Sequence, residues 1–253
     1  MTRYDFTTQP NRLDQNTMKW HEAESNPELL ELWVADMDFL PVPEIRDAVI
    51  NYAETHIFGY PYPSEELYQS IINWEKNQHG YVVDKESIVL IEGVVPAILT
   101  AIQAFTKEGD AVLINTPVYP PFARSVRLNN RRLIENSLVK VNGHFEIDFE
   151  QLERDIVEND VKLYVFCSPH NPGGRVWTKE ELTKVADLCQ KHGVLLVSDE
   201  IHQDLALYGN KHISMNTISD AYKDFTLVLS SATKTFNIAG TKNSFTIIEN
   251  EDL

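Results

Sequence analysis

A single lysine, Lys234, lies among small hydroxylated residues just after an apolar run, in TLVLSSATKTFNIAG (226–240). On its own it would most simply be a surface lysine, because lysine is seldom buried without a partner. Other apolar runs end in residues that could also do chemistry. These residues are Gly93, Val94, Tyr119, Asn171, Asp199, His202 and Ser231. In open α/β sheets ligands bind outside the carboxyl ends of the strands, so these residues could share one site.

The residue types suit pyridoxal 5′-phosphate (PLP). A lysine amine can form a Schiff base with the PLP aldehyde. A carboxylate such as Asp199 keeps the pyridine nitrogen protonated, so that the ring can absorb carbanion electrons. An amide such as Asn171 can donate to the ring oxygen, and an aromatic ring such as Tyr119 can stack on the cofactor. Backbone N–H groups at a helix start, with the hydroxyl of Ser231, suit the phosphate.

Each of these residues also has a simpler interpretation. Tyr119 could only pack its loop, and Asn171 could only form a turn, since Asn-Pro and Gly-Gly favour turns. Asp199 could cap a helix, His202 could be an ordinary core or surface histidine, and Ser231 could cap the next turn. Their shared position at the ends of successive strands favours the cofactor interpretation over five separate coincidences.

The elements that must position these residues alternate along the chain from residue 86. Apolar runs predict strands, and amphipathic segments with caps predict helices between them. Strands are expected within 87–93, 111–115, 131–139, 161–167, 194–200 and 226–231, and helices at 44–55, 64–80, 95–106, 148–159 and 178–193. Continuous apolar strands between amphipathic helices indicate an α/β protein, with a mainly parallel sheet covered on both faces. No G-x-G-x-x-G or G-x-x-x-x-G-K-[ST] motif is present.

The amino-acid composition argues against some classes of binding partner. The 22 basic and 38 acidic residues give a net charge of −16, which argues against nucleic acid and anionic membranes. The N-terminus lacks a signal-like apolar region, and no apolar stretch approaches membrane-spanning length. Cys167 and Cys189 are expected to be reduced, buried thiols of a cytoplasmic protein. The histidines show no metal-ligand spacing, and six are expected at the surface or in loops: His21, His56, His79, His144, His192 and His212.

Three motifs together resemble the PLP-dependent aminotransferases of fold type I, class I/II. They are SPHNPGGRVW, SDEIHQDL and SATKTFNIAG. WVADMDF (33–39), FGYPYPSEEL and EGVVPAI are similar to one branch of that superfamily, the cystathionine β-lyase or C–S lyase type. The resemblance covers essentially the whole chain. It implies the three-layer α/β/α PLP-dependent transferase fold.

The resemblance also implies roles for the residues around the cofactor. Lys234 would hold PLP and later move the substrate α-proton, while Asp199 would partner the pyridine nitrogen. Asn171 would donate to the ring oxygen, and Tyr119 would stack on the ring. Ser231, with the backbone at Gly93, Val94 and Val95, would hold the phosphate.

Further residues are placed by the resemblance at the edges of the site. Tyr60 would reach across a homodimer interface to the neighbour's PLP phosphate. His202 stands where many aminotransferases have tyrosine. Lys242 stands where an arginine often holds the phosphate, and a lysine lacks the bidentate fork of arginine. Ala35 and Asp36 would lie near the substrate carboxylate.

The chain departs from the family pattern in two short motifs and in length. Gly173 replaces a threonine, and Thr241 replaces a leucine. Family members continue well beyond the equivalent of Leu253, into a small domain bearing the arginine for the substrate carboxylate. The expected organisation is therefore an N-terminal arm with part of the small domain at 1–45, followed by an incomplete PLP-binding large domain at 46–253.

The function implied is a PLP-dependent C–S β-lyase. It would act on a small amino-acid substrate, cystathionine or a cysteine-like compound, and release thiol, pyruvate and ammonia by α,β-elimination. The shared motifs leave two alternatives open: transamination on the same scaffold, and a truncated PLP-binding or regulatory protein without catalysis. A homodimer is expected, without nucleic-acid or membrane partners.

Overall fold

The computed structural model describes residues 4–13, 15–26 and 28–253. They form two compact units. The smaller unit comprises the residues up to Tyr62 together with Ala232–Lys242, and the larger comprises Pro63–Ser231 with Asn243–Leu253. The smaller unit thus contains residues on both sides of the predicted domain boundary at 45/46. That boundary refers to the domains of a whole family member, and it stays a prediction.

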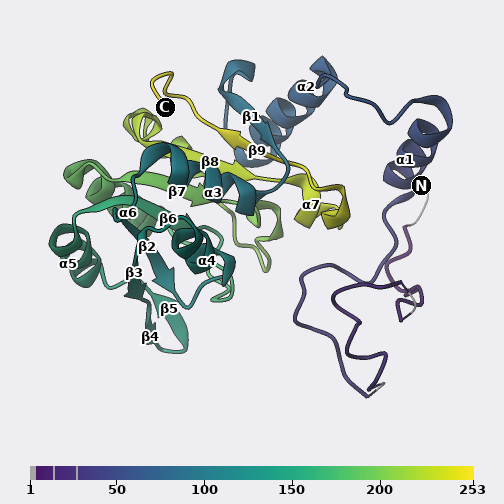
Figure 1. The fold of residues 1–253 in the computed structure, drawn as a ribbon, viewed down its shortest axis with the longest axis horizontal. Coiled ribbons are helices and arrows are strands. Elements are labelled where there is room, and N and C mark those ends of the chain that lie inside the picture. The colour runs from purple at the N-terminus through teal and green to yellow at the C-terminus, as the bar shows by residue number, and fades with distance from the viewer. Residues whose placement is uncertain (1–3, 14, 27) are drawn as a thin grey trace. The chain divides into compact units, whose positions relative to one another are not determined.

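The larger unit is built on a seven-stranded sheet in the order β1-β9-β8-β7-β6-β2-β3 (Figure 1). Its strands are β1 (Ile88–Ile91), β2 (Ala111–Thr116), β3 (Arg132–Ser137), β6 (Val161–Cys167), β7 (Leu195–Asp199), β8 (Thr226–Ser230) and β9 (Ser244–Ile247). β9 is antiparallel to both of its neighbours, and β2, β3, β6, β7 and β8 pair in parallel. β1 therefore runs in the same direction as β8, so both end at the same edge.

Helices cover both faces of this sheet, as the alternating pattern predicts. α3 (Val94–Phe105) and α4 (Pro121–Leu128) pack on one face, against residues such as Val165 and Val197. α5 (Phe149–Asn159) and α6 (Lys179–His192) pack on the other, against residues such as Tyr164 and Leu196. The fold is the expected three-layer α/β/α arrangement. A separate hairpin is formed by β4 (Val139–Val141) and β5 (His144–Glu146).

A third apolar cluster joins the first part of this unit to β8 and β9. α2 (Glu65–Trp74) continues into a π-helical turn (Glu75–His79) that ends at Gly80 in the left-handed conformation. Ile71 of α2 packs with Val228 and Ile247. Short 3-10 turns occupy Lys85–Ser87, Gln203–Leu205, Met215–Thr217 and Asp220–Asp224.

Local sequence signals explain where several helices begin and end. The side chain of Thr178 accepts from the N–H of Glu181, and the Glu181 carboxylate accepts from the N–H of Thr178, which completes a capping box. Gly193 ends α6 in the left-handed conformation, which glycine adopts without a Cβ penalty. The side chain of Ser64 caps α2 by accepting from the N–H of Leu67.

The sequence prediction missed α4, α7 (Ala232–Thr235), the β4–β5 hairpin and β9. α4 begins in the proline-rich stretch that contains Pro117, Pro120 and Pro121, which by its composition indicates a loop. Pro121 is the first residue of the helix, where a missing N–H costs nothing. The expectation for the histidines is wrong for His79, which lies in the π-helical turn with its side chain buried beside Asp204. His212 lies in a loop, as expected, but its side chain is buried 2.8 Å from Glu200.

The smaller unit contains α1 (Pro43–Thr55), α7 (Ala232–Thr235) and a 3-10 turn (Ala239–Thr241). The Asn237 side chain accepts from the N–H of Met37 and donates to the carbonyls of Met37 and Phe39, which joins two distant parts of the sequence. α1 has no buried residue. Among the described residues, no helix is long and apolar enough to span a membrane.

Candidate active site

The carboxyl edge of the sheet in the larger unit carries Asp199, the last residue of β7. Asp199 is 5% exposed. Side chains alternate between the faces of a strand, so Asp199 lies on the same face as Val197, which packs in the cluster with α3. Its Oδ1 accepts from the N–H of Ile201 at 3.1 Å. A buried carboxylate therefore lies on the α3 face, where the sequence predicts the partner of a cationic ring nitrogen.

Cys167 is the register partner of Asp199 on β6. Burial, and secondarily the charge of Asp199, raise the pKa of the Cys167 thiol. Cys167 stays a neutral thiol at physiological pH, and its sulfur accepts from the N–H of Asn171 at 3.3 Å. Both cysteines are free and buried, as predicted. Cys167 therefore acts as an anchor for the loop after β6.

The N-terminus of α3 lies beyond the carboxyl end of β1. Gly93 is the N-cap residue and supplies no side chain to bond the first N–H groups of the helix. The N–H groups of Val94 and Val95 are thus the kind that an anion satisfies, and the helix dipole adds to that attraction. A Cβ on Gly93 would lie 3.2 Å from Cδ of Pro96. This end of α3 fits the predicted phosphate site in its donor chemistry.

Tyr119 and Asn171, from the loops after β2 and β6, are joined through their backbones. The N–H of Tyr119 donates to the carbonyl of Asn171 at 3.1 Å. The Tyr119 ring is 43% exposed, with one edge against Phe122. The structure brings these two predicted residues together and leaves part of the aromatic ring accessible for stacking.

The loop that carries Asn171 also explains Gly173. The Nδ1 of His170 accepts from the N–H of Gly173 at 3.2 Å, and a Cβ on Gly173 would lie 2.6 Å from that nitrogen. Burial, with a smaller effect of Arg175, lowers the pKa of His170 to about 4, so the ring is neutral. The glycine that departs from the family pattern is thus required by the histidine beside it.

Two other predicted residues of the larger unit lie at this edge. Ser231 is buried, and its hydroxyl donates to the carbonyl of Asn243 at 2.5 Å. His202 is half-buried and precedes the 3-10 turn Gln203–Leu205, with its carbonyl accepting from the N–H of Leu205. The roles of both residues toward a cofactor remain predictions.

Lys234, Lys242 and Tyr60 belong to the smaller unit. Lys234 is half-buried in α7. Lys242 is exposed, with a φ of 49°, and ends the 3-10 turn Ala239–Thr241. The Tyr60 side chain is fully exposed. The roles of these three side chains toward a cofactor remain predictions.

The predicted substrate segment contains an ion-pair network that the sequence did not reveal. Arg12 donates to the carboxylates of Asp36 and Asp38, each at 2.5 Å, and Lys19 donates to Asp38 at 2.7 Å. Although burial opposes it, hydrogen bonds from Lys19, Trp20 and Arg12 hold the pKa of Asp38 below its ordinary value. Ala35 is exposed beside them. No sequence spacing links these residues, because the contacts join positions more than fifteen residues apart.

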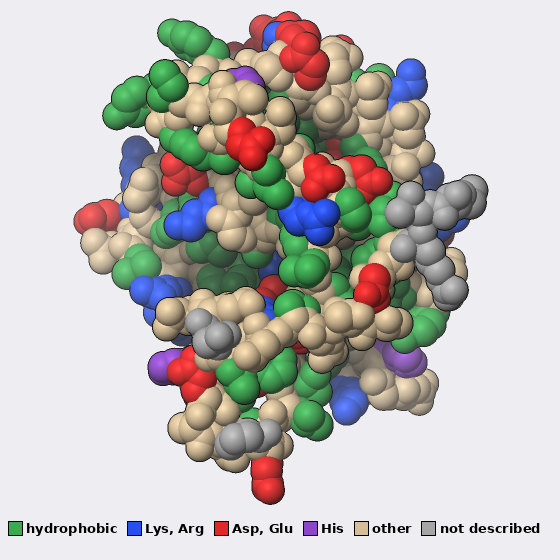
Figure 2. All heavy atoms as spheres, turned by 90° about the vertical axis from the view of Figure 1, so that its right-hand side faces the viewer, with side chains coloured by type: hydrophobic (Ala, Val, Ile, Leu, Met, Phe, Trp, Pro, Cys, Tyr) green, Lys and Arg blue, Asp and Glu red, His purple; other side chains and the backbone are tan. Residues whose placement is uncertain are grey.

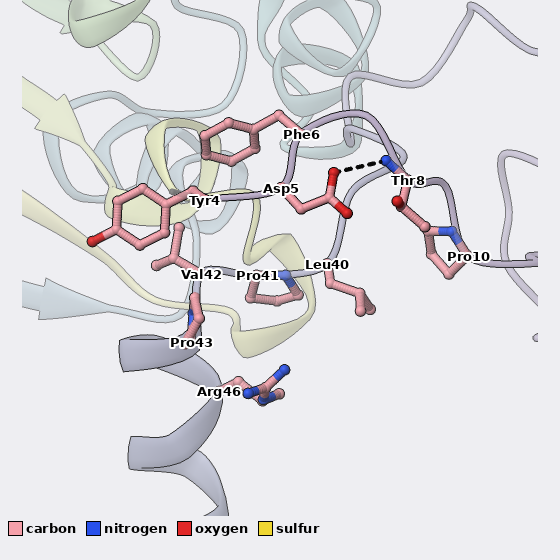
Figure 3. A pocket seen from close by; sticks show the side chains of 10 residues that line it. All are labelled: Tyr4, Asp5, Phe6, Thr8, Pro10, Leu40, Pro41, Val42, Pro43 and Arg46. Atoms are coloured by element: carbon pink, nitrogen blue, oxygen red, sulfur yellow. Dashed lines mark hydrogen bonds between the residues drawn. The ribbon is translucent and has the colours of Figure 1, made fainter. Parts of the chain in front are cut away.

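A hollow of about 190 Å³ lies elsewhere in the smaller unit, between the N-terminal segment and the start of α1 (Figure 3). Its lining includes Tyr4, Phe6, Pro41 and Arg46, and it contains no predicted site residue. Asp5 turns back on its own segment, where it accepts from the N–H of Thr8. This hollow is not the candidate site.

Comparison with known proteins places these observations in a family. Residues 27–253 match the family described as aminotransferase class I and II. Cystathionine beta-lyase PatB of Bacillus subtilis is 41% identical over 247 residues, which are 96% of this chain and 64% of that protein. Protein MalY of Escherichia coli is 34% identical, over 88% of this chain and 57% of that protein.

Solved structures give the same result. Cystalysin from Treponema denticola, which contains PLP, matches with a TM-score of 0.94 and 40% identity, over 99% of this chain and 65% of that one. A PLP-bound C–S lyase from Staphylococcus hominis matches with a TM-score of 0.92 and 32% identity, over 99% of this chain and 64% of that one.

The fold and the sequence together define the class: the chain belongs to the aminotransferase class I and II family. Within that family it is similar to proteins named cystathionine beta-lyase and C–S lyase. The predicted resemblance and fold are confirmed, and so is PLP as the cofactor of the family. The chain spans about 64% of the length of the curated relative from Bacillus subtilis.

Proposed function

We propose that the whole protein is a PLP-dependent carbon–sulfur β-lyase acting on cystathionine or a cysteine-like amino acid. The observation that carries this proposal is Asp199, a buried carboxylate on the α3 face at the carboxyl edge of the sheet. The relatives named cystathionine beta-lyase support the reaction type. When bound, PLP would supply an electron sink for the carbanion formed at the substrate α-carbon.

The residues of the larger unit fit PLP chemically. Asp199 would hold the ring nitrogen in its protonated form, because a buried carboxylate favours a cation beside it. The uncapped N–H groups of Val94 and Val95 and the hydroxyl of Ser231 would bind the phosphate. Asn171 would donate to the ring oxygen. The accessible face of Tyr119 would orient the ring and exclude water from it.

Lys234 would hold the cofactor covalently and move the proton. Lys234 follows the last residue of β8 by four positions, and four extended residues span at most about 14 Å. This short connection would allow the amine of Lys234 to serve a site at the end of β8. After substrate binding, the free amine would accept the α-proton, the β C–S bond would break, and the sulfur would leave as a thiol. His202 and Lys242 would border the cofactor, and Ala35 and Asp36 would border the substrate carboxylate.

A homodimer is part of the proposal, with Tyr60 reaching the partner's phosphate site. Apolar side chains near Tyr60 are strongly exposed, notably Ile57, Phe58 and Tyr62. Hydrophobic side chains also reach the surface at several places on the face shown in Figure 2. Exposed apolar area of this kind marks association surfaces in soluble proteins. A cytoplasmic location is supported by the two free, buried cysteines.

The decisive experiment combines trapping and turnover. The chain is mixed with PLP, reduced with borohydride and digested, and a pyridoxyl group is expected on Lys234 and absent from Lys234→Ala. The full-length protein is then given cystathionine, and release of thiol and pyruvate is expected. No adduct on Lys234 would contradict the proposed cofactor site.

Transamination is the second candidate, favoured by the match to the aminotransferase class I and II family and to an aspartate aminotransferase of Bacillus subtilis at 31% identity. Supplying a keto acid with the amino acid separates the two reactions. Stoichiometric transfer of the amino group without thiol release would favour transamination. An adduct on Lys234 without either turnover in the full-length protein would favour the non-catalytic alternative.

A further inference from the structure

Glu200, the residue after Asp199, is a carboxylate with no solvent exposure. Its Oε1 accepts from the Ser198 hydroxyl at 2.8 Å and from the N–H of Met215 at 3.0 Å. Its Oε2 lies 2.8 Å from Nε2 of His212, whose side chain is also buried. A polar group this deeply buried is costly unless it is fully hydrogen-bonded, so these partners specify one position for the side chain.

The contacts of Glu200 hold the end of β7 against a distant segment. Ser198 and Glu200 extend from the same side of the chain, and Asp199 extends from the opposite side, toward α3. The backbone is fixed as well, because the N–H of Glu200 donates to the carbonyl of Leu229 and the carbonyl of Asp199 accepts from the N–H of Ser168. The orientation of Asp199 is therefore coupled to the fit of Glu200 between β7 and Met215.

The residues that follow are anchored in the same way. The side-chain amide of Gln203 donates to Oε1 of Glu75 at 2.7 Å. Asp204 lies 2.8 Å from Nε2 of His79 and accepts from the indole of Trp74 at 3.1 Å. The His79 and His212 rings meet edge to face, with centroids 5.9 Å apart. One buried polar network thus underlies the segment from Glu200 to Asp204.

We propose that Glu200 is a positioning residue that fixes Asp199 in its orientation toward the α3 face, through its bonds to Ser198, Met215 and His212. The inference rests on the proposed role of Asp199 as the partner of the PLP nitrogen. Glu200 itself extends away from the α3 face, toward Ser198, Met215 and His212. Its effect on the cofactor is therefore expected only through Asp199.

The first test reads the Asp199 carboxylate directly, without cofactor. The N–H of Ile201 donates to Oδ1 of Asp199, so hydrogen exchange at Ile201 reports that geometry. In Glu200→Ala, exchange at Ile201 is expected to rise at least tenfold. In Glu200→Gln, which keeps the Oε1 acceptor, the rate should stay close to that of the unmodified chain, well below a threefold change. The control is Val185→Ala, a buried change in α6 far along the sequence from this turn.

The second test reads the cofactor. The dissociation constant for PLP is expected to rise at least tenfold in Glu200→Ala, to be restored by Glu200→Gln, and to change little in Val185→Ala. In Glu200→Ala, the pH dependence of the long-wavelength absorption band of bound PLP should change, because Asp199, the proposed partner of the pyridine nitrogen, is displaced. If the unmodified chain binds no PLP, the proposed function fails, while exchange at Ile201 still decides the positioning role.

Two results would overturn the inference. The first is a rate of hydrogen exchange at Ile201 that is unchanged in a folded Glu200→Ala, or that changes no more than it does in Val185→Ala. If Glu200→Ala does not fold, Ser198→Ala takes its place, because it removes one donor to Oε1 and leaves the carboxylate otherwise paired. Ser198→Ala should raise the rate of hydrogen exchange at Ile201 by about threefold. The second result that would overturn the inference is an unchanged rate at Ile201 in this variant.

Discussion

Two helices that the sequence predicts, α1 and α3, have opposite environments. α3 buries Val94, Ala97, Ile98, Ala101 and Ile102 against the sheet of the larger unit. α1 has a proline start and apolar residues at helical spacing, yet none of its residues is buried. Helix periodicity therefore shows which face of a helix is apolar. It does not show which element packs against that face, because that depends on the tertiary structure.

The largest expected effect compares truncations in the two units. Leu163→Ala in β6 removes a fully buried side chain and should lower the free energy of unfolding by about 2–5 kcal/mol. Val49→Ala in α1 removes an exposed side chain and should change it by no more than about 0.5 kcal/mol. Urea denaturation at low protein concentration measures both. A comparable loss for Val49→Ala would show that α1 is packed within one chain.

The next effect concerns a buried acid of the larger unit. Burial raises the pKa of Glu75 to about 7, from an ordinary value of 4.5. Between these values the folded state binds more protons than the unfolded state, so stability must fall as pH rises. Hydrogen bonding to Asp204 raises the pKa of His79 despite its burial, which extends the same trend above pH 6.5. At pH 8 the ionised Glu75 is expected to cost up to about 3 kcal/mol.

Glu75→Gln tests that expectation, since the amide oxygen can still accept from Gln203. The variant should gain stability over the unmodified chain as pH rises from 5 to 8, and the two should converge near pH 4.5. Glu158→Gln, at an exposed position of α5, is the control for the loss of one acidic charge. A constant difference between Glu75→Gln and the unmodified chain at all pH values would contradict the assignment.

A smaller effect compares two glycines. A Cβ on Gly173 would lie 2.6 Å from Nδ1 of His170 and 3.3 Å from Cδ2 of Phe145, so Gly173→Ala should cost about 1–3 kcal/mol. Gly240, in the smaller unit, has nothing within 4 Å of the same position, so Gly240→Ala should be nearly neutral. Thermal unfolding of both variants provides the comparison. Equal melting temperatures would mean that His170 moves aside without cost.

The smallest effect tests the connection inside the smaller unit. Asn237→Gly keeps the left-handed backbone at φ 55° but removes three side-chain hydrogen bonds to Met37 and Phe39. About 1 kcal/mol of local stability should be lost, which corresponds to roughly fivefold faster hydrogen exchange at Met37. Exchange at Leu163, in the larger unit, should stay unchanged. A parallel change there would show that the two units unfold together.

Much of the α/β unit could be predicted because its signals are local. Thr178, Glu181 and Gly193 fix the ends of α6 within the helix itself. The apolar runs predicted β6, β7 and β8. The polar residues at the ends of these runs predicted Asp199, Asn171 and Ser231 as site residues. The direction of β1 placed Gly93 at the same edge, as expected. The roles of these side chains toward PLP stay predictions.

What the sequence determined by itself is the set of helices and strands with clear periodicity and caps, and the family that their motifs resemble. Only the tertiary structure decided the place of β9, a four-residue strand inserted between β1 and β8. It also decided the partners of Glu200, which lie up to fifteen residues away, and those of Gln203 and Asp204 on the turn after α2. Caps and periodicity act within one element. Strand order and buried polar pairs depend on which distant surfaces close over one another, and no local spacing records that choice.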